Sequence, residues 1–175
     1  MPQYIRPRVP GASVFFTLAL ADRQSDLLVR DVVRLRQAVR QTQADWPFAI
    51  VAMVVLPDHL HAIWQMPEND TDYATRWRLI KARFSARLAA ADHRAPSKIS
   101  KGEKGIWQRR YWEHHIRSDA DFIAHVQYCW INPVKHGLVL RAVDWPYSSI
   151  HRDIRRGMVG PGWSGELAEG EFGEI

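Results

Sequence analysis

Three stretches of the chain are apolar enough, and short enough, to be β-strands. Residues 14–20 (VFFTLAL) are rich in aromatic and β-branched side chains, which is typical of a buried strand. Residues 48–56 are almost unbrokenly apolar but too short for an ordinary amphipathic helix, so they indicate a central strand. A tight turn at Pro57 and Asp58 then predicts that residues 59–66 return as an antiparallel strand.

Apolar residues at helical spacing form stripes that predict three helices. The second of these helices runs over residues 71–91. The third helix, 119–131, starts at a capping box formed by Ser118 and Asp121 and is expected to end at Asn132, because the residue before a proline resists helical geometry. The first stripe consists of four residues at i, i+4, i+7 and i+11: Leu28, Val32, Leu35 and Val39.

A loosely alternating segment, 111–116, predicts one more strand before the third helix. The order of elements is then strand, helix, strand, strand, helix, strand, helix. This order matches a ferredoxin-like α+β domain, in which an antiparallel sheet has its helices packed on one face.

The charge distribution sets the C-terminal end of the chain apart. The chain has 24 Lys and Arg against 19 Asp and Glu, a net charge of +5. Beyond Arg156 there are four acids and no base, so residues 1–156 carry +9. We therefore expect one domain over residues 1–157 and an acidic, Gly-rich tail over residues 158–175. A basic body favours a phosphate-rich partner such as nucleic acid, although many basic proteins bind nothing acidic.

Cysteine content and hydropathy bear on where the protein works. A lone Cys129 excludes an internal disulfide, and the apolar runs fall short of the about 20 residues that span a bilayer. The N-terminus lacks the apolar core of a signal peptide. These features predict a cytoplasmic, nucleoid-associated protein with no membrane partner. The acidic tail either folds over the basic body and competes with DNA or stays solvated, and its composition favours the second.

His59, Leu60 and His61 form the most informative triplet. On a strand the two histidines point to one face and Leu60 to the other, so the imidazoles stand on the exposed face of the sheet with their Cβ atoms roughly 6–7 Å apart. Two ring nitrogens at that spacing can bind one divalent ion. The spacing also occurs by chance. A structural Zn²⁺ site is disfavoured because the cysteine is not near the pair.

A second group lies on the third predicted helix. Tyr128 and Asn132 are four residues apart, and His125 precedes Tyr128 by three, so all three share one helix face. The alternative is a half-buried core tyrosine with a hydrogen-bonded hydroxyl, with Asn132 as the C-terminal cap of the helix. The pattern alone favours this alternative.

The two groups together resemble a known family. The segments VVLPDHLH, WQRRYWEHHIR, HVQYCWINPVKHGL and DWPYSS are similar to those of single-tyrosine HUH transposases of the IS200/IS605 type. They resemble most closely the REP-associated tyrosine transposase branch of that family. The resemblance runs from about Tyr4 to Gly157.

The resemblance implies a fold, a reaction and a substrate. A ferredoxin-like domain would hold Mg²⁺ or Mn²⁺ with His59, His61 and Asn132 as ligands. Tyr128 would be the nucleophile that opens single-stranded DNA, giving a 5′-phosphotyrosine and a free 3′-hydroxyl. The substrate would be an imperfect palindromic (REP) hairpin with a short single-stranded flank. This branch is expected to act as a monomer rather than a dimer. His125 or His136 could move the tyrosine proton.

DNA binding beyond the centre is inferred from charge. Trp107 and Trp112 are candidate stacking platforms for bases. For each of these tryptophans and for the cations named next, the pattern favours the alternative, a core aromatic or plain surface charge. The candidate phosphate contacts are Arg76, Arg83, Arg87, Arg109, Arg110 and Lys135.

Two other functions compete with a metal-dependent nicking and joining enzyme for single-stranded DNA. One is a non-catalytic nucleic-acid-binding module, a domesticated transposase. The other is a metal phosphohydrolase for a small substrate, for which the histidine pair alone would suffice. Replacement of Tyr128 separates the three, because only the nicking enzyme forms a covalent adduct through it.

Overall fold

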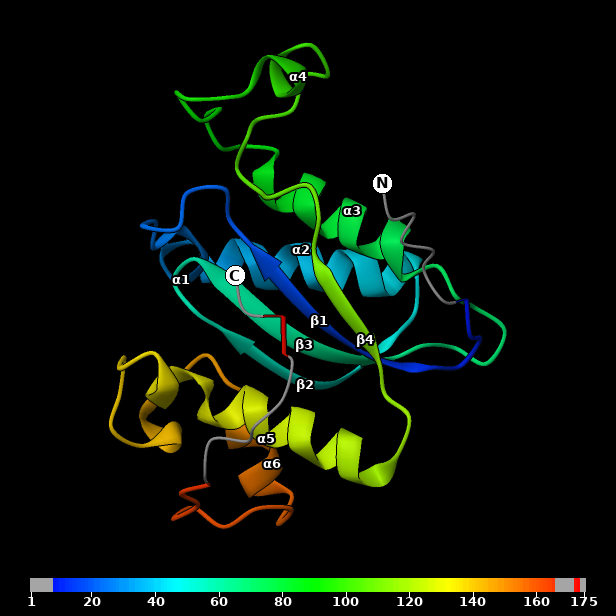
Figure 1. Cartoon of the computed structure of the whole chain (residues 1–175), viewed down its shortest axis with the longest axis vertical. Coiled ribbons are helices and arrows are strands. Elements are labelled where there is room, and N and C mark those ends of the chain that lie inside the picture. Colours follow the sequence, from blue (N-terminus) through cyan, green and yellow to red (C-terminus); the bar gives the residue numbers. More distant parts are fainter. Residues whose placement is uncertain (1–7, 166–171, 174–175) are drawn as a thin grey trace.

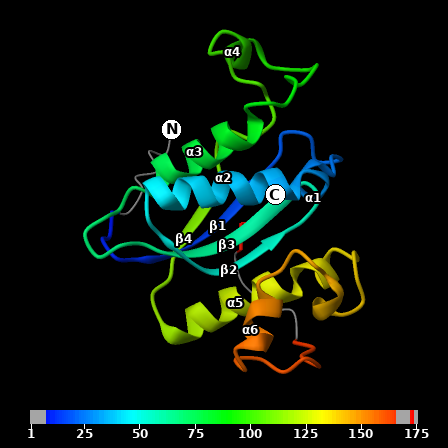
Figure 2. The same cartoon turned by 180° about the vertical axis from the view of Figure 1, so that it is seen from behind.

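The computed structural model describes residues 8–165 and 172–173. Its core is a four-stranded antiparallel sheet in the order β2-β3-β1-β4, with helices on both faces (Figures 1 and 2). This is the strand order of a ferredoxin-like domain. The elements in chain order are β1 (Ser13–Ala19), α1 (Leu27–Arg30), α2 (Val32–Asp45), β2 (Ala49–Val55), β3 (His59–Gln65), α3 (Tyr73–Ser85), α4 (Pro96–Ile99), β4 (Trp112–His115), α5 (Asp119–Lys135), η1 (Ala142–Asp144) and α6 (Ile150–Arg155).

The predicted α+β class is confirmed, and the placement of the helices needs one correction. Helices α2 and α3 cover one face, as expected, whereas α5 packs on the opposite face (Figure 2). The apolar side of α5 explains this second layer, because Cys129 is buried against Ala52, Val54 and Ile63 of the sheet. The sheet is thus covered on both sides, and in the two central strands, β1 and β3, the side chains on both faces are largely buried.

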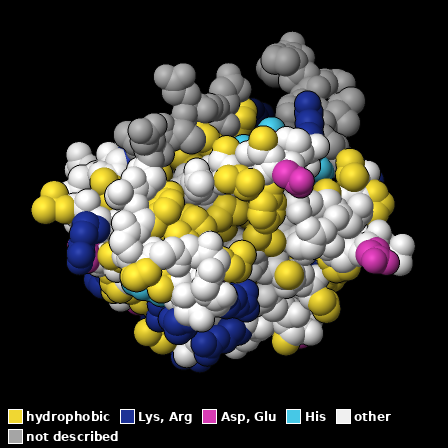
Figure 3. Space-filling model, turned by 90° about the horizontal axis from the view of Figure 1, so that it is seen from below, with side chains coloured by type: hydrophobic (Ala, Val, Ile, Leu, Met, Phe, Trp, Pro, Cys, Tyr) yellow, Lys and Arg dark blue, Asp and Glu magenta, His cyan; other side chains and the backbone are white. Residues whose placement is uncertain are grey.

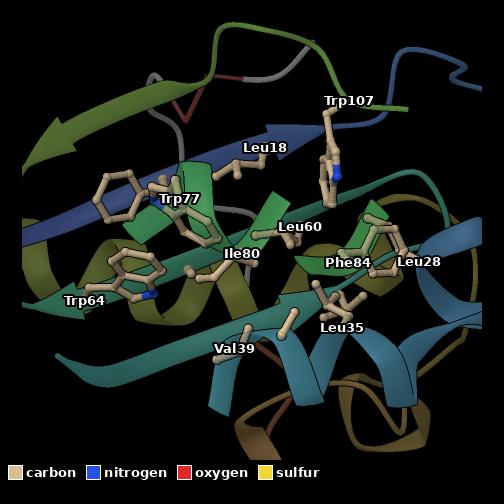
Figure 4. Packing of buried hydrophobic residues seen from close by; sticks show 14 of the residues in the cluster. Leu18, Leu28, Leu35, Val39, Leu60, Trp64, Trp77, Ile80, Phe84 and Trp107 are labelled. Atoms are coloured by element: carbon tan, nitrogen blue, oxygen red, sulfur yellow. The ribbon is translucent and has the colours of Figure 1, made fainter. Parts of the chain in front are cut away.

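The layer between the sheet and α2 and α3, here the α2/α3 face, is the main hydrophobic core (Figure 4). Alternate residues of β3, Leu60 and Trp64 among them, point into it as the sequence predicts. Trp64 stacks on Trp77 of α3, with ring centroids 3.9 Å apart. Phe16 of β1 packs edge-on against the same indole of Trp77. These contacts fix the position of β3 and thereby of the histidines on its other side.

Helix α5 continues past the point where the sequence predicts its end. It runs through Pro133 to Lys135. A proline in the last turn removes only one backbone hydrogen-bond donor from the helix. The hydrogen bonds of the turn that follows hold this end of the helix in place. Gly137 has φ +66°, and the amides of Gly137 and Leu138 donate to the carbonyls of Val134 and Pro133 at 2.9 Å each. This is a Schellman ending, which allows the helix one more turn beyond Asn132.

Helix α3 is shorter than predicted and stops at Ser85. The Lys104 ammonium donates to the last carbonyls, those of Ser85, Ala86 and Leu88, at 3.0, 2.7 and 2.7 Å. A cation at this end satisfies carbonyls that have no partner within the helix. The following segment, with α4, extends away from the sheet before it returns as β4 (Figure 1).

The outer edge of β2 is covered by the segment that follows η1. The Val55 amide donates to the Tyr147 carbonyl at 2.9 Å, and the Ser149 amide to the Met53 carbonyl at 2.8 Å. The Arg152 guanidinium donates to the Ile50 carbonyl at 2.9 Å. This edge therefore has few free backbone groups for another strand. Among the described residues, no helix is long and apolar enough to cross a membrane.

Candidate active site

Both histidines of the triplet lie between the sheet and α5, on what is here the α5 face. His59 and His61 are buried, with 5% and 1% of their surface exposed. The expectation that they stand on an exposed face is wrong, because α5 covers it. The Tyr128 ring from α5 packs edge-on against His61, with ring centroids 5.1 Å apart. The fold thus brings the predicted nucleophile against the predicted metal ligands.

Hydrogen bonds fix which nitrogen of His61 is free. Its Nδ1 lies 2.8 Å from the Thr17 hydroxyl, and that hydroxyl donates to the Phe172 carbonyl at 2.9 Å. A hydroxyl has one proton to donate, so Thr17 accepts from the Nδ1–H of His61. The Nε2 atom then carries the lone pair, and it is buried with no partner among the described residues. Burial holds the pKa of His61 well below its usual value, which keeps the ring neutral.

His59 is oriented by a carboxylate. Its Nδ1 donates to Asp58 at 2.7 Å, and Arg23 donates to the other oxygen of Asp58 at 2.6 Å. Burial lowers the pKa of His59, and the hydrogen bond to Asp58 works against this shift. A histidine whose Nδ1–H is held by a carboxylate presents its Nε2 as a ligand, and this arrangement recurs around protein-bound metals. Sequence reasoning missed Asp58, although it directly precedes His59.

Asn132 lies one helical turn after Tyr128 and is fully buried. Its amide oxygen and nitrogen both lack a hydrogen-bond partner within the described part of the chain. The C-terminal cap of α5 is His136, so the reading of Asn132 as a cap is wrong. An unpaired buried amide costs about 1–3 kcal/mol. An amide oxygen and an imidazole nitrogen without partners are groups that can bind a divalent ion, so the chemistry of Asn132 and His61 suits the predicted metal role.

Two more side chains, from residues that follow Asn132 in the chain, lie near Tyr128 and His59. The Lys135 ammonium lies 5.1 Å from the centroid of the Tyr128 ring. The His136 ring lies 4.9 Å from that of His59. Both side chains are exposed. They add positive charge and a titratable group at the solvent side of the buried histidines.

A residue of the predicted acidic tail, Phe172, lies on Tyr128, the predicted nucleophile. The Phe172 ring stacks on Tyr128, with centroids 3.8 Å apart and planes at 9°. It also contacts the rings of Phe15 and His125. The four acids on which the expectation for the tail was based lie outside the described residues. Phe172 itself was not singled out by the sequence, since one phenylalanine in a polar tail carries no periodic signal.

A second titratable cluster joins β4 to α5. His114 Nε2 lies 2.9 Å from Asp121, and His125 Nδ1 lies 3.0 Å from the same carboxylate. One potential ligand atom from each residue falls within 4.8 Å of the others, as in a metal site. The two imidazoles are stacked at 9°, so their lone pairs lie in parallel planes instead of converging. We therefore interpret the cluster as a link that anchors the start of α5.

The surroundings of this cluster also shift the pKa values of His125 and Asp121. Burial lowers the pKa of His125, and its hydrogen bond to the backbone carbonyl of Asp121 works against that. Burial works to raise the pKa of Asp121, but the hydrogen bond from His114 and other contacts keep it below its usual value. The group joins β4 to α5 across the turn between them, and the periodicity of either element alone did not predict it.

The predicted phosphate contacts fall into two groups. Arg76 is 1% exposed, and its guanidinium donates to Asp70 and to backbone carbonyls of Trp46, Pro47 and Asp72. The prediction for Arg76 is therefore corrected, because the side chain holds the structure together and is closed to DNA. Arg83 bonds Thr42 and Asp45 of α2 and is partly exposed. The exposed cations are Arg87, Arg109, Arg110 and Lys135.

Positive charge also occurs elsewhere on the surface. Figure 3 views the molecule from the side of α5 and α6 and shows Lys and Arg side chains gathered at one edge of that face, beside hydrophobic ones. Arg155 and Arg156 at the end of α6 are also exposed. Charge alone therefore does not locate the DNA. Of the two predicted stacking platforms, Trp107 is buried and Trp112 is 40% exposed.

A ferredoxin-like sheet with paired histidines beneath a tyrosine-bearing helix is the arrangement expected of an HUH-type tyrosine transposase. The family model described as IS200-like transposase matches residues 15–129, so the chain belongs to this family of enzymes. It is 43% identical over 174 residues to the REP-associated tyrosine transposase of Escherichia coli K12, covering 99% of this chain and 98% of the relative. The predicted REP-associated branch is confirmed.

Two further comparisons agree. The chain is 42% identical over 166 residues to a protein of Haemophilus influenzae Rd named as a putative REP-associated tyrosine transposase, covering 94% of each. Among solved structures, it matches that of a REP-associated tyrosine transposase bound to a REP hairpin. That match has a TM-score of 0.88 and 42% identity, covering 100% of this chain and 98% of the other.

Proposed function

We propose that this protein is a metal-dependent single-stranded DNA endonuclease and strand transferase that acts on REP-type hairpins through a 5′-phosphotyrosine intermediate. One observation carries the proposal. The Tyr128 ring lies against His61, whose Nε2 is buried and unpaired, and the unpaired Asn132 amide follows one turn later on α5. The solved relative bound to a REP hairpin supports the substrate class.

His59 and His61 would hold the ion through Nε2, and Asn132 through its amide oxygen. Two imidazole nitrogens and one oxygen suit Mn²⁺ at least as well as Mg²⁺, and we propose one of these two. A divalent ion bound by these residues would offset the charge of a phosphate oxygen and help to orient the phosphorus for attack. Asp58 and Thr17 hold the Nδ1 atoms of His59 and His61, which leaves each Nε2 as the atom that would bind the ion.

Tyr128 performs the bond exchange. Its oxygen attacks phosphorus, and the bond from phosphorus to the 3′ oxygen breaks. The products are a 5′-phosphotyrosine and a free 3′-hydroxyl, which takes up one proton, while Tyr128 gives up its own. The step conserves the number of phosphodiester bonds, so it can reverse with a second 3′-hydroxyl and join strands. Lys135, close to the Tyr128 ring, adds positive charge where the phosphate arrives.

The exposed cations Arg87, Arg109, Arg110 and Lys135 would contact phosphates, with Arg83 in a lesser role. We further propose that the protein acts as a monomer. The covered edge of β2 supports this, since that edge offers few free groups for a strand from a second copy. The catalytic domain would be residues 1–157 and the tail residues 158–175. An enzyme of chromosomal repeats would work at the nucleoid.

The decisive experiment incubates the protein with end-labelled REP-type hairpins carrying a single-stranded flank, with Mn²⁺ or Mg²⁺. Denaturing gels should show a DNA-linked protein band that is absent with EDTA. Tyr128→Phe should remove the band completely and leave hairpin affinity, measured by fluorescence anisotropy, within about twofold of wild type. Binding without any adduct would favour the domesticated, non-catalytic alternative. Turnover of small phosphoesters that survives Tyr128→Phe would favour a phosphohydrolase.

A further inference from the structure

A large pocket lies away from the histidines and Tyr128, on the α2/α3 side of the sheet. It has a volume of about 730 Å³ and is formed by α3 and by residues 102–111, which lead into β4. Pockets of this size accommodate small organic ligands. The centre described above does not use it, since that centre lies under α5.

The lining of this pocket is cationic. It includes Arg78, Lys81, Lys104 and Arg109, against one carboxylate, Glu103. Arg109 pairs with Glu103 at 3.0 Å, and Lys104 is occupied at the end of α3. Arg78 is exposed and forms no ion pair or hydrogen bond with the described residues. The net charge therefore suits an anionic ligand such as the phosphate of a nucleotide.

The interior of the pocket has aromatic and polar groups. The Lys81 ammonium lies 5.7 and 5.4 Å from the rings of Trp107 and Tyr111. The Ser85 hydroxyl and the Trp107 indole N–H have no hydrogen-bond partner in the described part of the chain. The Gln108 side chain likewise bonds to none of the described residues. Aromatic rings, a free amide and cations together are the groups that bind an unpaired base and its phosphate.

The sheet connects this pocket to the candidate active site. His61, Thr17 and Trp112 are register partners across β3, β1 and β4 and share the α5 face. Strands are about 4.8 Å apart, so Trp112 is about 10 Å from His61. Trp112 is 40% exposed at the edge strand, and its neighbour Tyr111 lines the pocket. Phe172 lies on Tyr128 and Gly173 lies against Trp112, so a DNA strand that leaves Tyr128, passes Trp112 and turns round the edge of β4 takes the place of these two residues.

We propose that the pocket between α3 and residues 102–111 binds an unpaired nucleotide of the single-stranded flank of the DNA substrate. The inference rests on the proposed function for its substrate and adds a second binding site to it. The base lies against the apolar and aromatic floor, with Gln108 at its edge. The phosphate lies at Arg78.

Affinity measurements test this directly. Ala82 is an exposed residue of α3 that lines the pocket, so Ala82→Trp fills it without removing a contact. Ala82→Trp and Arg78→Ala should each weaken binding of a flanked hairpin by roughly tenfold in EDTA, the size of one base contact. Both variants should bind a blunt hairpin, which has no single-stranded flank, as tightly as the wild-type protein does. The matched controls, Ala44→Trp and Arg40→Ala on the exposed side of α2, should change neither affinity.

Photocrosslinking gives the second readout. Flanks carrying 5-bromodeoxyuridine at successive positions should crosslink to peptides containing Trp107 or Tyr111 at one position, and Ala82→Trp should remove that crosslink. Equal affinity of Ala82→Trp and wild type for the flanked hairpin, or crosslinks confined to other peptides, overturns the proposal while adduct formation through Tyr128 stands. A pocket crosslink in a protein that forms no adduct overturns the catalytic proposal instead.

Discussion

In the two central strands, β1 and β3, both faces of the sheet are buried, but they are built from different side chains. On the α2/α3 face the buried side chains of β1 and β3 are apolar, from Phe16 to Trp64 (Figure 4). On the α5 face the same two strands present Thr17, His59 and His61, all at least 95% buried. The first face is a hydrophobic core that stabilises the domain. Both faces bury polar atoms that have no partner among the described residues, which costs stability. In the α2/α3 core these include the indole nitrogens of Trp64 and Trp77, whereas on the α5 face they are the Nε2 of His61 and the amide of Asn132, which are predicted ligand atoms. The predicted nucleophile, Tyr128, packs against His61 on this second face.

Neighbouring residues of β3 can break this comparison most severely. Leu60→Ala removes a fully buried side chain from the α2/α3 face and should lower the free energy of unfolding by about 2–5 kcal/mol. His61→Ala loses the hydrogen bond to Thr17 but none at Nε2 within the described residues, so it should cost less than Leu60→Ala, and it should abolish the DNA adduct. Urea unfolding and adduct gels on both variants measure the two effects.

The pair is its own control, because both changes truncate to alanine on one strand. Below the unfolding transition, Leu60→Ala should retain most of its adduct yield. The comparison fails if His61→Ala destabilises the protein as much as Leu60→Ala, or if it still forms the adduct in Mn²⁺. The first result would make His61 a structural histidine, and the second would remove it from the ligand set.

The sequence predicted the alternation of β3 because a period of two needs no knowledge of tertiary structure. It did not predict that α5 covers the histidines, since the pattern of a strand shows which residues share a face and not what covers that face. Arg76 was misplaced for the same reason. Its position on α3 is at the margin of the apolar stripe, and only the fold shows carbonyls of Trp46 and Pro47 beside it.

More of the candidate site was predicted from the sequence than of the tertiary contacts that surround it. Tyr128, Asn132 and the two histidines followed from the family resemblance, and spacing alone had favoured a capping role for Asn132. Thr17 and Phe172 were missed because they act through contacts between distant segments, and Asp58 was interpreted only as a turn residue although it is adjacent to His59. The Thr17 hydroxyl, for example, joins His61 of β3 to Phe172, which is 155 residues away.

Phe172 allows a finer test of the α5 face, because it is an apolar ring placed on the nucleophile. Phe172→Ala should raise the initial rate of adduct formation by about two- to tenfold, since an aromatic pair contributes about 0.5–1.5 kcal/mol. The stacking on Tyr128 gives the physical reason. Rates are measured with subsaturating hairpin in Mn²⁺ on denaturing gels.

Salt separates stacking from charge in this variant. If the ring closes the site, the gain persists at 50 and 300 mM NaCl, whereas a gain caused by the acids of the tail falls as salt screens them. Met158→Ala, an exposed apolar residue at the start of the tail, is the control and should leave the rate unchanged. An unchanged rate in Phe172→Ala would show that the stacked ring does not limit access of DNA to Tyr128.

The smallest effect concerns a single buried histidine of the α5 face, His125. Burial lowers its pKa in the folded protein, against about 6.5 in the unfolded chain. Below pH 6.5 the unfolded chain therefore binds more protons than the folded protein. The free energy of unfolding should then decrease as the pH is lowered, by at most about 1.4 kcal/mol per pH unit for this residue. Above about pH 6.5 the imidazole is neutral in both states, and this loss of stability is absent. His125→Gln should flatten the curve between pH 7.5 and 5, measured by urea unfolding, whereas His93→Gln in the exposed segment should not.

Parallel curves for His125→Gln and wild type would mean that burial on the α5 face leaves this imidazole as easy to protonate as in water. The contrast between the faces would then rest on the residues around Tyr128 alone.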